Sequence, residues 1–238
     1  MKIYVINLVR SSERKEIFDK YNSKYITYEY IEAVDGKELD KKNLNPEIIN
    51  DKCIFPDGYI GNALSHLTLW QKCIELDEPI IIMEDDTIVH NNFNTYLETI
   101  LKQLPADFDI LQLCYNFDHL LSYQTTNYEI ANTLFDNKKI TKEDIELFRV
   151  ADINPCIAKL YHCFGISCYI ISPRGAKTMI QNCFPLTDGI VFLPLGMRVR
   201  YNSIDCIMNS GYKQINAYVS LLPFAMVPHG ADFNPSTI

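Results

Sequence analysis

Short apolar runs alternate with amphipathic stretches along most of the chain. The runs are rich in β-branched residues, which predicts strands over residues 2–8, 26–31, 109–114, 163–171 and 217–222. Between them, helical spacing and capping residues predict helices over residues 11–21, 61–77, 93–104, 172–183 and 203–210. This alternation predicts the α/β class, with a mostly parallel, open, doubly wound sheet and helices on both of its faces.

Two segments break the alternation. Residues 37–58 carry prolines and an Asp-Gly turn signal, and they are predicted to be irregular. Residues 115–160 are more polar, and we interpret them as an insertion or flexible region with a short helix at 141–149. The length of 238 residues suits one large α/β domain, which we expect to comprise residues 1–238.

A further predicted strand, over residues 79–86, ends in the carboxylates Glu84, Asp85 and Asp86. If strand geometry holds to its end, Glu84 and Asp86 point one way and Asp85 the other. Open α/β sheets bind ligands at the carboxyl ends of their strands, and clustered carboxylates there favour a cation or a hydroxyl-rich ligand. The alternative is a solvated acidic turn before a helix, with Asp86 or Thr87 as the N-cap.

Composition narrows the classes of partner. The chain has a net charge of −8, a pI near 5.1 and no block of basic residues. Nucleic acid is therefore not expected as a partner, and no polybasic patch is available for an anionic membrane. Asn7 and Arg10 interrupt the N-terminal apolar run, so we expect no secretory signal, and no window reaches the roughly 20 apolar residues of a membrane span. These features predict a cytoplasmic protein without a transmembrane segment, with peripheral attachment to the inner face of the membrane as a variant of that location.

The eight cysteines form no C-x-x-C pair, and most of them lie inside apolar runs. Without a signal peptide they are expected to be reduced core residues. A zinc site would need tighter paired spacing, so none is expected.

Short motifs stand in a fixed order along the chain. They are Asn7-Leu8 with Arg10 and Arg14, Ala33-Val34-Asp35-Gly36, Gly61 to His66 with Trp70, Met83 to Asp86, Tyr169 to Ala176, Ile204-Asp205 and the closing Ser236-Thr237-Ile238. In this order they resemble glycosyltransferase family 25, which includes bacterial lipopolysaccharide and lipooligosaccharide glycosyltransferases and the collagen galactosyltransferases. The sequence departs from the family pattern at Ala63, where cysteine is common, and at Ser203, where proline is frequent.

The resemblance implies a GT-A type fold and an inverting, metal-dependent transfer of a sugar, such as galactose from UDP-galactose, to a glycan or glycolipid such as lipooligosaccharide. It also implies a nucleotide-sugar-binding half (1–114), a variable insertion (115–160) and an acceptor-side half (161–238). A divalent cation, Mn²⁺ or Mg²⁺, would stabilise the charge that gathers on the departing diphosphate. One or two protein carboxylates suffice to hold it, because phosphate oxygens and water complete its ligands.

The resemblance also suggests roles for individual side chains. Asp86 is the main candidate metal ligand, Glu84 is a second ligand or a ribose contact, and His229 is a late ligand or a surface-loop residue. Asp85 would contact donor-sugar hydroxyls or serve the structure. The remaining donor-binding candidates are Asn7, Arg10, Arg14, Asp35, Ser65 and His66.

Several of these residues have structural alternatives. Arg10 and Arg14 could lie on a solvated helix face, because arginine is mostly exposed. Asp35 could cap the turn at Gly36. His66 could be a core histidine that is hydrogen-bonded to the backbone.

Inversion needs a base that deprotonates the acceptor hydroxyl, and a carboxylate is a usual choice. Asp205 opens the predicted helix over 203–210, where the helix dipole would keep it ionised. Asp188 is the rival candidate, although Asp-Gly is also an ordinary turn signal. A non-catalytic nucleotide-sugar-fold protein that binds a glycan or a partner remains the alternative to an enzyme.

Overall fold

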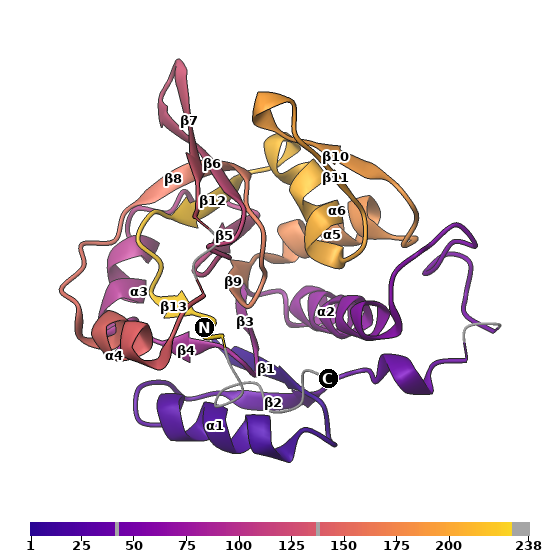
Figure 1. Cartoon of the computed structure of the whole chain (residues 1–238), viewed down its shortest axis with the longest axis horizontal. Helices are drawn as coiled ribbons and strands as arrows, with labels where there is room; N and C mark the ends of the chain where they lie inside the picture. Colours follow the sequence, from indigo (N-terminus) through magenta and orange to yellow (C-terminus); the bar gives the residue numbers. More distant parts are fainter. Residues whose placement is uncertain (41–42, 137–138, 230–238) are drawn as a thin grey trace.

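The structure is a computed structural model that describes residues 1–40, 43–136 and 139–229. Over these residues, nine strands form a central sheet in the order β2-β1-β3-β9-β5-β12-β8-β6-β7 (Figure 1). The strands are β1 (Ile3–Asn7), β2 (Glu29–Glu32), β3 (Ile80–Glu84), β5 (Ile110–Gln112), β6 (Leu120–Thr126), β7 (Glu129–Leu134), β8 (Ile157–His162), β9 (Cys168–Ile171) and β12 (Ala217–Ser220). Six of the nine share one direction, whereas β9, β8 and β7 are reversed. The predicted α/β class with a mostly parallel central sheet is confirmed.

Helices cover both faces of this sheet because successive strand residues point to opposite sides. In β3, Ile80 and Ile82 join a core with α2, α5 and α6, whereas Ile81 and Met83 join a second core with α1 and α3. The helices are α1 (Ser12–Asn22), α2 (Asp57–Leu76), α3 (Phe93–Leu101), α4 (Lys142–Val150), α5 (Pro173–Cys183) and α6 (Ile204–Gly211). The short 3₁₀ turns are η1 (Gly36–Glu38), η2 (Pro194–Gly196) and η3 (Tyr212–Gln214).

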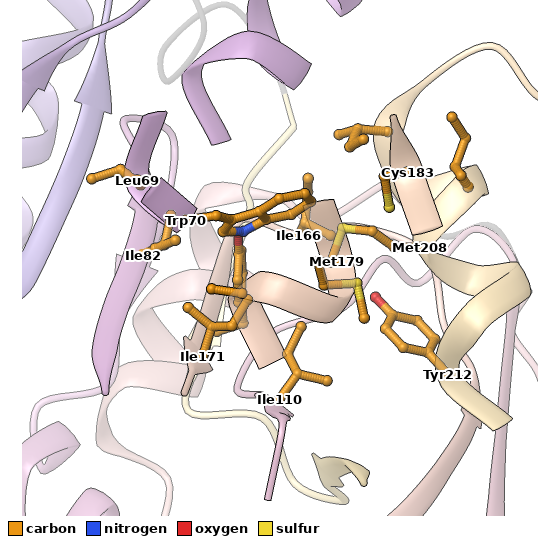
Figure 2. Close-up of a cluster of buried hydrophobic side chains, with 14 of the residues drawn as sticks. Leu69, Trp70, Ile82, Ile110, Ile166, Ile171, Met179, Cys183, Met208 and Tyr212 are labelled. Atoms are coloured by element: carbon orange, nitrogen blue, oxygen red, sulfur yellow. The ribbon is translucent and has the colours of Figure 1, made fainter. Parts of the chain in front are cut away.

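The first core is built around Trp70 of α2, which has no exposed surface (Figure 2). Met179 of α5 and Met208 of α6 pack in the same cluster, together with Ile171 from the sheet. The Trp70 indole Nε1 donates a hydrogen bond of 2.8 Å to the Tyr169 hydroxyl on β9. This contact ties α2 to the centre of the sheet and so fixes the position of the residues at its N-terminal end.

The interpretation of the segment 115–160 as flexible is wrong, because most of its described residues belong to strands and a helix, whereas its interpretation as an insertion stays a prediction. It supplies β6, β7 and β8 to the central sheet, and β6 and β7 form a hairpin that projects at the top of Figure 1. The β7 strand is exposed along nearly its whole length, so it has no apolar side from which its period could be read. The predicted helix at 141–149 is confirmed as α4, where Thr141 and Asp144 form a capping box.

Other differences concern element boundaries. The α2 helix begins four residues earlier than expected, β2 is displaced toward the carboxyl end of 26–31, and β9 begins at Cys168 after a loop over 163–167. Two small two-stranded sheets were not expected from the sequence, and they pair β4 (Ile88–Val89) with β13 (Ala225–Met226) and β10 (Ile190–Phe192) with β11 (Arg198–Arg200). The predicted α5 and α6 helices are confirmed.

In the part of the chain that the structure describes, no helix combines the length and the apolar character that crossing a membrane requires. Six of the cysteines are buried, whereas Cys156 is exposed. Burial raises the pKa of several of these thiols, among them Cys114 and Cys73, each to about 12. Their redox state in the cell stays a prediction.

Candidate functional site

A cleft of about 710 Å³ lies where β1 and β3 end. These neighbouring strands are parallel, with Ile6 opposite Glu84, so their carboxyl ends meet at one edge, and the acidic cluster lies at such an edge as expected. The cleft is also walled by the 33–36 loop, the start of α2, the 164–167 loop and residues from 199 to 206. It brings together most of the predicted site residues, namely Arg10, Arg14, Asp35, Ser65, Glu84, Asp85, Asp86, Asp205 and His229.

The three carboxylates do not alternate as expected, because β3 ends at Glu84 and the next two residues lie in a turn. Asp85 and Asp86 instead share one cation. The Arg14 guanidinium lies 2.5 Å from Asp85 Oδ1 and 3.0 Å from Asp86 Oδ2. Glu84 makes its hydrogen bonds to α2. The turn therefore aims two carboxylates at α1 and leaves Glu84 with a separate environment.

The surroundings of Asp86 oppose the ionisation of its carboxyl group. Burial, together with the charge of Glu84, raises the pKa of Asp86 to about 7 even though Arg14 acts in the opposite direction. Its Oδ1 atom is buried and accepts no hydrogen bond from the described residues. A buried carboxylate oxygen without a partner is suited to a hard cation, which binds oxygen ligands.

His66 and Asn62 of α2 hold Glu84 in place. Asn62 Nδ2 donates to Glu84 Oε1 at 2.6 Å, and His66 Nε2 lies 3.3 Å from the same oxygen. Burial opposes ionisation of Glu84, but His66, with help from Asn62 and Arg14, outweighs it and lowers the pKa of Glu84. The second ring nitrogen, His66 Nδ1, lies 2.8 Å from the Tyr169 hydroxyl.

His66 and Asn7 were candidates for donor contact, but neither of them lines the cleft. His66 is fully buried against Tyr169 and acts on the cleft through Glu84. Asn7 is buried as well, and its amide donates to Asp85 Oδ2 at 2.7 Å. The two buried side chains therefore hold Glu84 and Asp85 in place without lining the cleft themselves.

The 33–36 loop is fastened to α2 by close backbone contact. The Ser65 hydroxyl accepts a hydrogen bond of 2.9 Å from Val34 N and donates one of 2.7 Å to Gly61 O. A Cβ atom on Gly61 would collide with the Val34 carbonyl and lie 2.6 Å from Gly36 N. Only glycine allows this approach. The Ser65 hydroxyl is thus already engaged by the backbone and helps to shape the cleft wall.

Asp35 both caps a turn and forms an ion pair. Its carboxylate accepts a hydrogen bond of 3.0 Å from Lys37 N, which is the capping role considered from sequence. It also pairs with Arg10, whose Nε lies 2.5 Å from Asp35 Oδ2. Arg10 lowers the pKa of Asp35, and 48% of the Arg10 side chain but only 15% of the Asp35 side chain is exposed.

The two candidate bases lie in different surroundings. Asp205, in the first turn of α6, lines the cleft and accepts hydrogen bonds from Gly165 N at 3.1 Å and Cys206 N at 2.9 Å, as well as from the Ser203 hydroxyl. Gly165 has a φ of +85°, a conformation that favours glycine. Asp205 is therefore a fixed carboxylate that faces the cleft.

Asp188 does not line the cleft. Both of its carboxylate oxygens accept hydrogen bonds of 2.9 Å from the Arg200 guanidinium. Arg200 lowers the pKa of Asp188. Asp188 Oδ1 also accepts a hydrogen bond of 2.9 Å from Gly189 N, which is the local contact of an Asp-Gly turn.

His229 lines the cleft, but its Nδ1 atom already accepts a hydrogen bond of 3.2 Å from Ile140 N. Across the described ranges, no group of three or more histidine, cysteine or acidic side chains is arranged to hold a metal ion. A cation in this cleft would therefore depend chiefly on Asp86 and on ligands that a bound substrate supplies.

Three residues that line the cleft, Asn62, His119 and Phe164, were not identified as candidates from the sequence. Asn62 binds Glu84, and it stands one helical turn before His66, so their shared helix face could have indicated a common partner. The His119 and Phe164 rings stack with centroids 4.5 Å apart on the Asp205 side of the cleft. These two come from distant segments, and no local pattern links them.

The sequence of the chain is similar to those of known proteins. The model of "Glycosyltransferase family 25 (LPS biosynthesis protein)" matches residues 1–192. A "Glycosyltransferase 25 family member" of Aedes aegypti is 30% identical over 191 residues, covering 75% of this chain and 28% of that protein. "Lipooligosaccharide biosynthesis protein lic2B" of Haemophilus influenzae is 32% identical over 99 residues, covering 40% of this chain and 36% of that protein.

The chain spans only part of the curated relatives that it matches, between 28% and 56% of the length of four such proteins, these two included. Solved structures resemble it only distantly. A197 from STIV covers 92% of this chain and 81% of its own, with 11% identity and a TM-score of 0.38. A UDP-glucose pyrophosphorylase mutant from Leishmania major covers 98% of this chain and 54% of its own, with 12% identity and a TM-score of 0.35. Likeness at this level carries no argument about function.

Proposed function

The chain belongs to glycosyltransferase family 25, and from that premise we propose that it transfers a sugar from a nucleotide diphosphate donor to a glycan acceptor. One observation carries the proposal. A single cleft has the Arg14, Asp85 and Asp86 cluster on one wall and the anchored carboxylate of Asp205 on another. Charge for a diphosphate and a base for a hydroxyl are the two requirements of inverting sugar transfer.

The donor side is the edge formed by β1, β3 and the start of α2, in keeping with a GT-A type arrangement. Arg10 and Arg14 supply guanidinium groups, which match phosphate oxygens in bidentate geometry. The 33–36 loop is held rigidly by Ser65 and offers backbone groups to a nucleoside. A uridine diphosphate sugar, such as UDP-galactose, is the donor that we propose.

A divalent cation, Mn²⁺ or Mg²⁺, is proposed at Asp86, because the unpartnered Oδ1 of that residue fits an oxygen-binding ion. Glu84 and His229 line the same cleft and are the further candidate ligands. When bound, the ion would supply positive charge against the diphosphate leaving group. Within the protein, Arg14 contributes charge of the same sign, and the hydrogen bonds from Asn62 and His66 keep Glu84 ionised.

Asp205 is proposed as the general base. Its carboxylate would take the proton of an acceptor hydroxyl while that oxygen forms a bond to the anomeric carbon and the bond from this carbon to the diphosphate breaks. The hydrogen bonds from Gly165 and Cys206 fix the carboxylate before the acceptor arrives, which is the preorganisation such a step needs. His119 and Phe164 offer a stacked aromatic surface beside it.

The acceptor class that we propose is a glycan of a bacterial lipooligosaccharide. Its support is the name of the Haemophilus relative and the description of the matching family. A cytoplasmic location, with or without peripheral attachment to the membrane, follows from that proposal. A division into donor half, insertion and acceptor half stays a prediction, although the central sheet takes strands from all three segments.

The first prediction tests the donor site. UDP binding is expected to strengthen on addition of Mn²⁺, and Asp86→Asn is expected to abolish most of that gain, because one ligand charge is removed. The measurement is calorimetric titration of UDP with Mn²⁺ or with EDTA. Equal affinity for UDP in both conditions would refute the cation.

The same protein is then incubated with a panel of nucleotide sugars, and release of the free nucleotide is followed. Turnover of one donor supports the enzyme. Tight UDP binding with no turnover of any donor, with or without glycan acceptors, would instead favour a non-catalytic glycan-binding protein.

A further inference from the structure

Arg14 occupies the position from which positive charge would act on the carboxylate edge. It extends from α1 and contacts Asp85 at 2.5 Å and Asp86 at 3.0 Å, and 18% of its side chain is exposed. Two carboxylates thus share one guanidinium inside the cleft. Any divalent cation that binds Asp86 must either accept a cationic neighbour or displace it.

The pairing of Arg14 with this edge is incomplete. Arg14 Nε and Asp86 Oδ1 are both buried, and neither has a hydrogen-bond partner among the described residues. Buried polar atoms are usually bonded, so an unsatisfied donor and an unsatisfied acceptor in one ion pair need an explanation. A phosphate oxygen would satisfy Nε, and a cation would satisfy Oδ1.

We propose that Arg14 is a displaceable internal counter-ion, which neutralises Asp85 and Asp86 until a divalent cation and a nucleotide diphosphate enter together. Asp86 would then hold the cation, and the Arg14 guanidinium would turn to the diphosphate. This inference rests on the proposed function, since it concerns the same donor site. It adds that cation and nucleotide depend on each other for binding.

The charges explain this dependence. A cation that arrives alone meets the guanidinium, and a diphosphate that arrives alone meets Glu84, Asp85 and Asp86. When both arrive, each like-charge contact is replaced by an attractive one. In the structure a single nitrogen, Arg14 Nη2, contacts both aspartates. A phosphate can accept from two guanidinium nitrogens at once, so the exchange would keep a charged partner and would also engage Nε. Such coupling between two ligands is reciprocal.

The test measures Mn²⁺ binding without nucleotide, by the loss of the free-ion signal in electron paramagnetic resonance. Arg14→Gln is expected to bind Mn²⁺ alone about 5- to 150-fold more tightly than the unaltered protein, the usual range of coupling between two sites. In the same variant, the gain in UDP affinity on addition of Mn²⁺ is expected to shrink. Arg14→Lys, which keeps the charge but not the fork, is expected to fall between the two.

Arg10→Gln is the matched control, because Arg10 lines the same cleft but pairs with Asp35. It is expected to leave Mn²⁺ binding unchanged, since it touches neither Asp85 nor Asp86. An equal increase in both variants would overturn the proposal and indicate a general charge effect.

Two further outcomes separate this inference from the proposed function. If UDP binding to the unaltered protein needs Mn²⁺ but Arg14→Gln binds Mn²⁺ alone no better, only the counter-ion role is overturned. If UDP binds equally well with and without Mn²⁺, the proposed cation site is refuted, and the counter-ion role of Arg14 is refuted with it. Should Arg14→Gln not fold, the same comparison is made with Arg14→Lys, and Mn²⁺ affinity equal to that of the unaltered protein then overturns the proposal.

Discussion

At the scale of single residues, Asp205 and Asp188 lie in different surroundings, whereas the sequence could only rank them as candidate bases. Asp205→Asn keeps the shape of the side chain but removes the base, so transfer should fall by about 10² to 10⁴. Affinity for UDP should change little, because Asp205 lies away from the Arg14 cluster in our assignment. The measurement is kcat for sugar transfer beside the calorimetric affinity for UDP.

Asp188→Asn is the matched control for that prediction. Its carboxylate pairs with Arg200 outside the cleft, and exposed pairs of this kind contribute little to stability. The variant should therefore keep kcat close to that of the unaltered protein. Loss of turnover in Asp188→Asn but not in Asp205→Asn would exchange the two roles.

At the scale of elements, the site depends on how closely α2 approaches the 33–36 loop. Gly61→Ala would place a methyl group against the carbonyl of Val34. Forcing the two apart should cost about 1–3 kcal/mol of stability, as overpacking usually does. It should also weaken UDP binding, because the loop forms one wall of the cleft. Urea unfolding and UDP titration measure the two effects.

The control for Gly61 lies one turn earlier in the same helix. A Cβ on Gly58 would meet nothing within 4 Å. Gly58→Ala should therefore leave stability unchanged or raise it by up to about 1 kcal/mol, since alanine is the better helix former. Equal destabilisation by both substitutions would show that the contact of Gly61 with the loop is not what explains the loss.

Element prediction succeeded for longer elements with a buried apolar face, and it failed for the exposed strand β7 and for the two-residue strands β4 and β13. The α5 helix was predicted because Ser172 and Pro173 mark its start and its apolar face follows helical spacing. The β6–β7 hairpin was missed because its outer strand is held by pairing with β6 alone and carries polar residues on both sides. Backbone pairing between strands leaves no trace in a local hydrophobic pattern.

The candidate site, too, could be predicted only in part. The acidic cluster at the carboxyl end of β3 could be anticipated from the sequence, whereas the pairing of β3 with β1 is set by the strand order of the sheet. The turn after Glu84 could not be predicted, because the hydrophobic pattern does not show at which residue the strand ends. Had the strand continued, Asp85 and Asp86 would point to opposite faces of the sheet. Contacts across the fold, such as that of Arg14 with both aspartates, depend on the packing of α1 beside β3 and are not local in sequence.

At the scale of the whole molecule, buried histidines should make folding sensitive to acid. His162 is almost fully buried, donates from Nδ1 to Asn209 Oδ1 at 2.9 Å, and has no partner for Nε2 among the described residues. Burial lowers the pKa of His162, Lys213 acts in the same direction, and the bond to Asn209 opposes them. His90 is a second case, in which burial and Arg149 lower the pKa.

The sign of the effect follows from the proton count. Below the unfolded pKa of about 6.5, the unfolded chain takes up a proton at each histidine that the folded chain resists. The stabilisation from these neutral histidines is therefore complete above that value and is lost as the pH falls below it. Asp86, whose pKa is raised to about 7, acts in the opposite direction, since its stability contribution is lost as the pH rises. The pH profile of the intact protein is thus a sum of opposing terms.

A comparison of two proteins isolates one of those terms. His162→Gln keeps a donor for Asn209 but cannot titrate, and Asp86 is present in both proteins, so its contribution cancels in the difference. The free energy of unfolding in urea should fall more steeply for the unaltered protein than for His162→Gln between about pH 7.5 and about pH 5.5, the range in which histidine titrates. The stability gap between the two should therefore narrow with acid. A gap that stays constant over this range would show that His162 takes up a proton as readily in the folded chain as in the unfolded one, and that its burial between β8 and α6 is not what limits the stability of the molecule in acid.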